Sequence, residues 1–167
     1  SCCDIQLLKP GTDDYQTKVS LISTDGSHDR VLSLRPQSQE YSWSPDGQGL
    51  AYDAIGETDY ELRVHDLTLG RERILGDGDN HTHIDRTPAW SPSGKTIAFE
   101  RRHRKYPAAS LWTVDVETGQ TKQLFQKLAD VVDPVFSPDG KSLIFGSNHD
   151  RRPGLDLFSM DLSTLEM

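Results

Sequence analysis

Apolar and polar residues alternate along most of this chain in short segments that are separated by turn-forming residues. The segments at 62–67, 111–116 and 155–160 show the clearest alternation, with apolar side chains recurring at every second position. A period of two is typical of strands that bury one face. The 3.6-residue period of an amphipathic helix is missing, so the pattern predicts strands throughout.

A short motif recurs in front of these segments. It consists of an aromatic residue, Ser, Pro, Asp or Ser, and Gly, and it occupies 43–47, 90–94 and 136–140, so that its aromatic residues lie 47 and 46 residues apart. Pro presets φ, Asp or Ser bonds the local backbone, and Gly accepts positive φ. Each motif therefore predicts a tight hairpin turn that leads into the apolar runs at 49–52, 96–99 and 142–145.

Each repeat continues with a polar loop, the alternating segment, a second turn such as 117–119 and a further strand such as 121–125. The unit is thus four antiparallel strands. Four-stranded units of about 40–50 residues in tandem are typical of a β-propeller. A helical repeat of similar length is disfavoured, because Pro and Gly occur inside every unit. We therefore predict an all-β fold, a β-propeller segment of about three and a half four-stranded antiparallel blades.

The predicted organisation is a single propeller region over residues 1–167. It divides into a partial blade at 1–37, blades at 38–84 and 85–130, and a second partial blade at 131–167. A closed ring needs at least four blades. We therefore expect either a segment of a larger ring or a homodimer in which two chains complete one ring.

The residues that carry the repeat also resemble a known family. The segments 88–99, 133–145 and 111–119 are similar to the TolB-type, or WD-like, propeller repeat, and the resemblance covers essentially the whole chain. Ser93 replaces the usual Asp of the turn, and the blade that begins at Tyr41 lacks the Pro before its aromatic residue. Both departures are expected to be tolerated, since Ser makes the same local bond and the Pro mainly stiffens strand entry.

What this resemblance implies for function is a set of alternatives. TolB itself is a periplasmic platform for protein docking, and similar repeats occur in sensor domains of membrane-anchored winged-helix regulators, in propellers of prolyl-oligopeptidase-type peptidases and in metal-dependent lyases of acidic oligosaccharides. Our leading expectation is a non-catalytic, extracytoplasmic scaffold that binds a protein, a peptide or another ligand and needs no cofactor. The sensor and the lyase remain the alternatives.

Charge and composition exclude several classes of binding partner and of structural site. The formal net charge is −8, which disfavours a nucleic-acid backbone as the partner. No run approaches the roughly 18 apolar residues of a membrane-spanning helix. Only Cys2 and Cys3 are present, so a disulfide framework and a cysteine zinc site are excluded. Ser1-Cys2 fits the end of a lipoprotein cleavage site, which leaves lipidation with membrane anchoring through a missing N-terminal segment, or an arbitrary cut, as the two readings.

Catalytic residues are not predicted, because the chain lacks the Gly-x-Ser-x-Gly nucleophile motif and a recognisable grouping of Ser, His and Asp. The loop at 77–85 is the densest polar cluster. His81 and His83 would project to one side of an extended segment and suit a divalent metal, but no third fixed ligand is evident and no metal site is predicted. A solvated loop rich in turn formers is the alternative interpretation.

Two candidate binding surfaces remain. The first is the mouth of the channel, where loops enter each first strand; its residues are His81, His83, Asp85 and Asp133. The second is a basic set of loops between second and third strands, opposite acidic loops that carry Asp13, Asp14, Glu57 and Asp59 in the earlier blades; its residues are Arg101, Arg102, Arg104, Lys105, Arg151 and Arg152. Such an uneven charge distribution would orient a charged partner.

Overall fold

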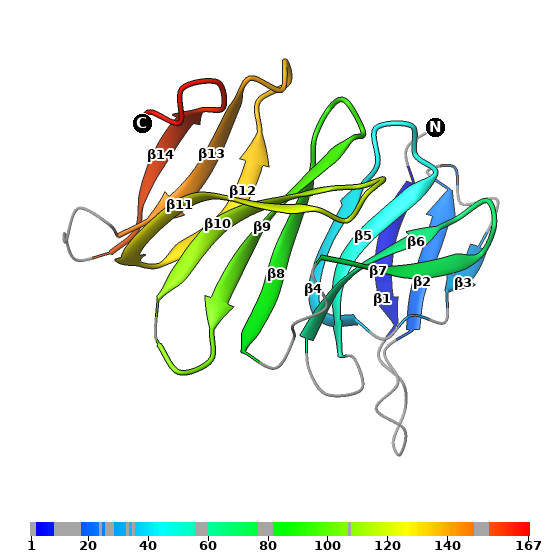
Figure 1. Ribbon diagram of the computed structural model, residues 1–167. Coiled ribbons are helices and arrows are strands. Elements are labelled where there is room, and N and C mark those ends of the chain that lie inside the picture. The colour runs from blue at the N-terminus through cyan, green and yellow to red at the C-terminus, as the bar shows by residue number, and fades with distance from the viewer. Residues whose placement is uncertain are drawn as a thin grey trace.

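The computed structural model describes residues 3–8, 18–23, 25, 29–32, 34, 36–55, 60–76, 82–106, 108–148 and 154–167. Every regular element in these ranges is a strand, and none of them holds a helix able to cross a membrane. The described strands form four antiparallel sheets that follow one another along the chain and pack side by side (Figure 1). The all-β prediction is confirmed.

Within each sheet, strands that are neighbours in sequence are neighbours in space. The first sheet contains β1 (Cys3–Leu8), β2 (Lys18–Ser23) and β3 (Asp29–Leu32). The second contains β4 (Pro36–Trp43), β5 (Gly49–Ile55), β6 (Tyr60–Asp66) and β7 (Arg71–Leu75). The third contains β8 (His83–Trp90), β9 (Thr96–His103), β10 (Ala109–Asp115) and β11 (Thr121–Ala129). The fourth contains β12 (Val131–Phe136), β13 (Ser142–Ser147) and β14 (Asp156–Asp161). β4 and β8 begin two residues before the expected repeat boundaries at 38 and 85.

The Ser-Pro motif forms the hairpin turn between the first and second strands of a sheet. In the second sheet the Gly47 amide donates to the Ser44 carbonyl at 2.9 Å, and Gly47 has a φ of 69°. The Ser44 hydroxyl accepts a hydrogen bond from the Gly49 amide at 2.7 Å. Gly is needed because this φ lies in the left-handed region. The third and fourth sheets repeat the turn with Gly94 at 74° and Gly140 at 70°.

Ser93 takes the place of the turn aspartate in the third sheet. Its hydroxyl lies 3.0 Å from the Ser91 hydroxyl and accepts from the Lys95 amide at 3.4 Å. In the second sheet, Asp46 accepts the corresponding bond from Gln48 at 2.9 Å. Serine therefore preserves the local bonding with a longer contact.

The second strand of a sheet is buried on both faces when a sheet lies on each side of it. In β5, Leu50 and Tyr52 pack toward the first sheet, whereas Ala51 packs toward Ile97 and Phe99 of β9. This explains why these strands are continuous apolar runs rather than alternating ones.

The hydrophobic core accordingly lies between sheets, in three clusters. The first and second sheets share Val19, Leu21, Leu32, Leu34, Leu50, Tyr52 and Ala54. The second and third share Ala51, Leu62, Val64, Leu75, Ile97, Phe99 and Val114. The third and fourth share Ala98, Ala109, Leu111, Phe125, Val131, Leu143, Phe145 and Met160.

The first strands β4, β8 and β12 lie side by side, since β8 contacts both of the others. Each has a shift in register, which in β8 falls between Arg86 and Ala89 and in β12 between Val132 and Val135. Thr87 and Asp133 adopt φ values of 50° and 49°, a conformation that is rare for residues other than Gly. These shifts bend the first strands at the same point of the repeat.

The outer face of the last sheet is apolar and open. Val135, Ile144 and Leu157 are 57%, 42% and 81% exposed. Ala51 and Ala98, which hold the repeat position of Ile144, are each buried against the following sheet. The open face thus has the character of an interface between sheets.

We expect the Phe145→Ala variant to lose about 3–5 kcal/mol of unfolding free energy, because it empties a buried site. The Phe145 ring is fully buried and lies 5.7 Å from the Phe125 ring. Ile144→Ala, one residue earlier on the open face, should lose less than about 1 kcal/mol. Urea unfolding followed by circular dichroism measures both, and equal losses would contradict the packing scheme.

Candidate functional site

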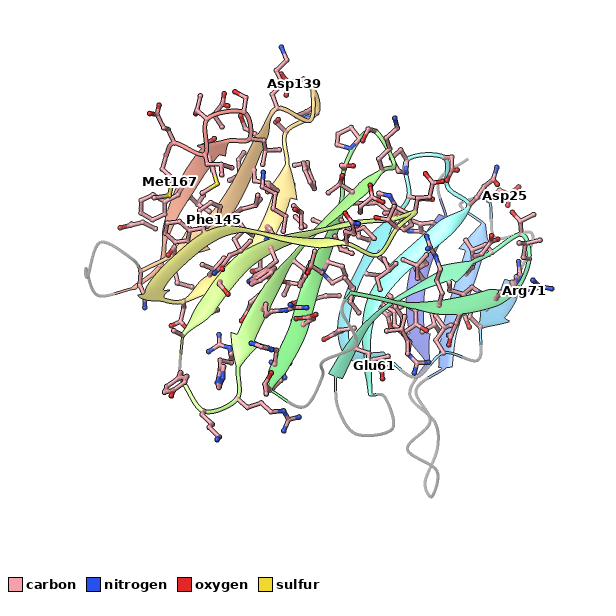
Figure 2. The ribbon with its side chains drawn as sticks, in the orientation of Figure 1. Asp25, Glu61, Arg71, Asp139, Phe145 and Met167 are labelled. Atoms are coloured by element: carbon pink, nitrogen blue, oxygen red, sulfur yellow. The ribbon has the colours of Figure 1, made fainter. Side chains whose placement is uncertain are left out.

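Connections between strands emerge at two opposite edges of the sheets (Figure 1). We call the edge that carries the Ser-Pro turns, including the turn at Asp139 labelled in Figure 2, the turn face. The opposite edge carries the connections between second and third strands and those that enter the next sheet, and we call it the loop face. The sequence-predicted residues belong to elements that lead to the loop face. His81, Arg151 and Arg152, like the acidic loop residues Asp13, Asp14, Glu57 and Asp59, lie outside the described residues.

Asp85 and Arg101 form a buried ion pair. They face each other across β8 and β9, and the Arg101 Nε donates to Asp85 Oδ1 at 2.7 Å while Nη2 donates to Oδ2 at 2.8 Å. Each residue is 4% exposed. The Arg101 guanidinium also lies 4.7 Å from the Trp112 ring centroid and 5.3 Å from that of Phe99. These two predicted binding residues are therefore engaged with each other inside the molecule.

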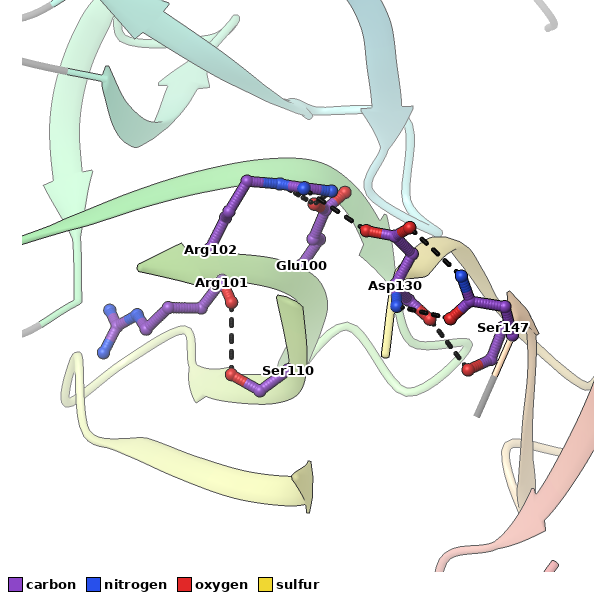
Figure 3. A network of polar contacts seen from close by, with 7 residues as sticks. Glu100, Arg101, Arg102, Ser110, Asp130 and Ser147 are labelled. Atoms are coloured by element: carbon purple, nitrogen blue, oxygen red, sulfur yellow. Dashed lines mark hydrogen bonds and ion pairs between the residues drawn. The ribbon is translucent and has the colours of Figure 1, made fainter. Parts of the chain in front are cut away.

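Arg102 links the third sheet to the entry of the fourth (Figure 3). It donates to Glu100 Oε1 at 2.9 Å and to Asp130 Oδ1 at 3.3 Å, and its side chain is 32% exposed. Asp130 is further bound by Asn148, whose amide nitrogen donates at 3.3 Å, and its carbonyl accepts from the Ser147 hydroxyl at 2.7 Å. This network fixes the crossing between the two sheets.

Arg104, Lys105 and Tyr106 form the exposed end of the connection between β9 and β10, and we call these three residues the 104–106 loop. Tyr106 is 62% exposed. Its ring lies 4.7 Å from the His103 ring, which in turn meets His83 edge to face at 5.2 Å. His83 and His103 are cross-strand partners, so the register of β8 and β9 brings this predicted histidine beneath the loop.

The backbone of the 104–106 loop is held at several points. The Arg104 amide donates to the Thr82 carbonyl at 3.0 Å, and the Lys105 amide donates to His103 Nδ1 at 3.0 Å. The Tyr106 amide donates to the His103 carbonyl at 3.3 Å. The loop is therefore ordered before any partner binds.

A second polar group follows the first strands. Asp133 is exposed on β12 and lies in the electrostatic neighbourhood of Glu40 on β4. Burial, followed by the charges of Asp133, Asp53 and Glu100, raises the pKa of Glu40, and Arg86 opposes this shift. Burial also raises the pKa of Glu100, against the charge of Arg102. Asp133 thus belongs to a group of carboxylates on the first and second strands, whereas Asp85 is paired with Arg101.

Asp53 and Glu100 are functional candidates that sequence reasoning missed. Each follows the buried aromatic residue of a second strand, Tyr52 or Phe99, at the same repeat position. The signal in the sequence that could have identified them is a carboxylate directly after an apolar run. Among the described residues, no group of three or more His, Cys, Asp and Glu side chains is placed to hold a metal ion.

Residues 7–166 match the family model of the TolB beta propeller domain, PD40. The chain belongs to this family. The TolB-type assignment agrees with a crystal structure of TolB from Acinetobacter baumannii, which is similar with a TM-score of 0.76 and 21% identity over 98% of this chain and 39% of that one. The β-propeller domain of the Trilobed protease from Pyrococcus furiosus gives a TM-score of 0.57 at 20% identity, over 77% of this chain and 40% of that one.

A sequence relative of this TolB-type chain is dipeptidyl-peptidase 5 of Porphyromonas gingivalis. It is 31% identical over 100 residues, which cover 52% of this chain and 14% of the peptidase. The TolB-type chain thus spans less than two thirds of its relatives' length. The structural likenesses, both below 25% identity, establish the propeller fold.

We expect Arg101→Met and Asp85→Asn each to lose about 3–5 kcal/mol of unfolding free energy, because either change leaves a buried charge unpaired. The double variant Asp85→Leu/Arg101→Met should recover most of the loss, since both charges are then absent. Arg104→Met at the exposed loop is the matched control and should change stability by less than about 0.5 kcal/mol. Denaturant unfolding of all four variants tests the pair, and a double variant that is no more stable than the singles would contradict it.

Proposed function

We propose that this TolB-type chain is an extracytoplasmic protein-interaction module without chemistry of its own, and that the 104–106 loop is its principal contact surface. The observation that carries this proposal is the combination of exposure and order in that loop. Tyr106 is 62% exposed, yet its ring packs against the His103 ring at a tilt and its backbone amide is hydrogen-bonded. An aromatic side chain held in one conformation loses little entropy when a partner covers it.

The composition of the loop supports a protein partner. Tyr and Arg are enriched among the residues that dominate binding energy at protein interfaces. Arg104 and Lys105 are both exposed in the turn that follows β9, whereas Arg101 is turned inward against Asp85. The surface charge of this loop is therefore positive in a chain whose net charge is −8. We propose that the partner presents an acidic surface, which this local charge would attract and orient.

Family membership supports the same proposal. The chain belongs to the TolB beta propeller domain family, and the TolB-type resemblance implies a platform for protein docking in the periplasm. The periplasmic location and anchoring to a membrane are therefore part of the proposal. Completion of a ring by a second copy of the chain also stays a proposal.

A second candidate is the propeller domain of a larger peptidase. The relationship to dipeptidyl-peptidase 5 favours it, because that relative is a named enzyme and the matched segment covers 14% of its length. In that case a catalytic domain outside the present sequence would supply the nucleophile. Expression of the full-length gene separates the two candidates: hydrolysis of dipeptidyl chromogenic substrates favours the peptidase, and its absence together with export of an alkaline phosphatase fusion favours the interaction module.

We expect a photo-crosslinking amino acid at position 106 to capture the partner in cells, because Tyr106 lies at the centre of the proposed interface. Binding of the purified partner should weaken about tenfold or more in the Arg104→Glu/Lys105→Glu variant. Added salt should weaken binding to the unaltered chain, because it screens the attraction, and should not weaken binding to the variant. Isothermal titration calorimetry at two ionic strengths measures both effects.

The control for this experiment is Lys95→Glu/Lys141→Glu. Both lysines are exposed next to Ser-Pro turns on the turn face, so the variant has the same change of charge at the opposite edge. If this control weakens binding as much as the loop variant does, the effect reflects net charge, and the proposed surface is wrong.

A further inference from the structure

A pocket of about 360 Å³ opens on the turn face between the second and third sheets. It lies on the edge opposite the 104–106 loop, away from the contact surface proposed above. Its lining comes from the Ser-Pro turns of both sheets, from β6, β7 and the end of β8, and from the residue after β10; the residues that matter for its chemistry are Asp46, Val64, Asp66, Arg73, Trp90 and Val116. Its volume is at the small end of the range for ligand sites, which suits a single side chain.

The apolar wall of the pocket is built around Trp90. The indole Nε1 donates to the Gly94 carbonyl at 3.0 Å, which fixes the orientation of the ring. The backbone amide of Trp90 donates to the Ser42 hydroxyl at 2.8 Å and so ties β8 to β4. Val64 and Val116 complete the apolar lining. This wall can hold the aliphatic part of a long side chain.

Gly49 makes room for the indole ring. A Cβ atom at this position would lie 2.9 Å from Trp90 Cη2 and 3.2 Å from the Ser44 hydroxyl. The next repeat has Thr96 at the position of Gly49 and Phe136 at the position of Trp90. The larger ring therefore occurs together with the residue that has no side chain, and this pairing shapes the pocket between the second and third sheets.

The charged residues at the pocket favour a cationic ligand. Asp46 and Asp66 both line it, and each uses its Oδ1 to accept backbone amides of its own turn, at 2.9 Å from Gln48 and at 2.8 Å from Thr68. Hydrogen bonding from the Ser44 hydroxyl, and then from the Gln48 amide, lowers the pKa of Asp46 and keeps it ionised. Arg73 also lines the pocket and contributes one positive charge to it. The lining thus carries two carboxylates against one guanidinium, and its negative balance attracts a positive charge.

We propose that this pocket between the second and third sheets binds a basic side chain, arginine or lysine, from an extended segment of a partner protein. The methylene groups of the side chain would lie against Trp90, Val64 and Val116, and its charged end would face Asp46 and Asp66. This arrangement combines apolar contact along the stem with charge pairing at the tip, which is how long basic side chains are commonly accommodated. The site adds a second contact on the face opposite the one in the proposed function.

The test uses the whole chain labelled with ¹⁵N and three blocked pentapeptides, Ala-Ala-X-Ala-Ala, in which X is arginine, citrulline or glutamate. Citrulline has the shape of arginine without its charge. The arginine peptide should give a saturable shift of the Trp90 indole resonance, and the citrulline and glutamate peptides should bind at least about fivefold more weakly. Equal binding of the arginine and citrulline peptides, or no shift of the Trp90 indole resonance at any soluble concentration, would overturn the proposal.

Asp46→Asn and Asp139→Asn are a matched pair of variants. Both aspartates accept a hydrogen bond from the turn serine, from Ser44 at 2.5 Å and from Ser137 at 2.7 Å, so the two changes disturb their turns alike. Only Asp46 lines the pocket. Affinity for the arginine peptide should fall about fivefold in Asp46→Asn and stay unchanged in Asp139→Asn. Equal affinities in the two variants would contradict the assignment of the charged end to Asp46.

The result of the peptide-binding test does not depend on whether the proposed function is correct. Arg104→Glu/Lys105→Glu changes the opposite face and should leave binding of the arginine peptide unchanged. If the partner captured at position 106 is lost but the peptide still binds, the proposed function fails and the pocket stands. If the peptide fails to bind while the partner is captured, the pocket fails alone.

Discussion

The structure depends on apolar contact between neighbouring sheets. In a sheet of this chain both faces of the second strand carry apolar side chains, so a sheet by itself cannot bury them. Burial of such side chains contributes about 1.5–3 kcal/mol each, and here that burial is obtained only when another sheet lies alongside. Tyr52, Phe99 and Phe145 are all fully buried in this way, each against the sheet that precedes it. Folding of each repeat is therefore coupled to the presence of its neighbour.

The polar contacts are organised around this packing. The Asp85–Arg101 pair continues the face of β9 that also carries Phe99, so the ion pair forms where the apolar interface approaches the loop face. Beyond it, the backbone of the 104–106 loop is bonded to Thr82 and His103. The exposed side chains are thus mounted on strands whose positions are set by the core. This gives a binding surface on a rigid scaffold, an arrangement common to proteins that recognise partners through loops.

The fold was predictable because its signals are local. The Ser-Pro turns, the period-two segments and their spacing of 47 and 46 residues each reflect chemistry within a few residues of the chain. The side chains at the loop face were harder to place. Arg101 and Arg102 read as part of a basic loop, yet β9 extends to His103, and strand alternation turns Arg101 toward Asp85. That outcome depends on which residue of β8 lies opposite, which one strand alone does not reveal. Predicting the pocket at Trp90 would have required the relative position of two sheets, because residues of both sheets line it.

The fit between Gly49 and Trp90 has a consequence for how such a chain evolves. Between the second and third blades, Gly49 leaves room for the Trp90 ring, and the following repeat has Thr96 and Phe136 at the equivalent positions. One blade therefore cannot replace another without changes at its junctions, even where the repeat sequences are similar. A tandem duplication of the third blade, for example, would place Thr96 before a second Trp90, where the present junction has Gly49, and that junction would have to change before the new blade could pack. The order of the blades is therefore constrained by the side chains that pack at each junction.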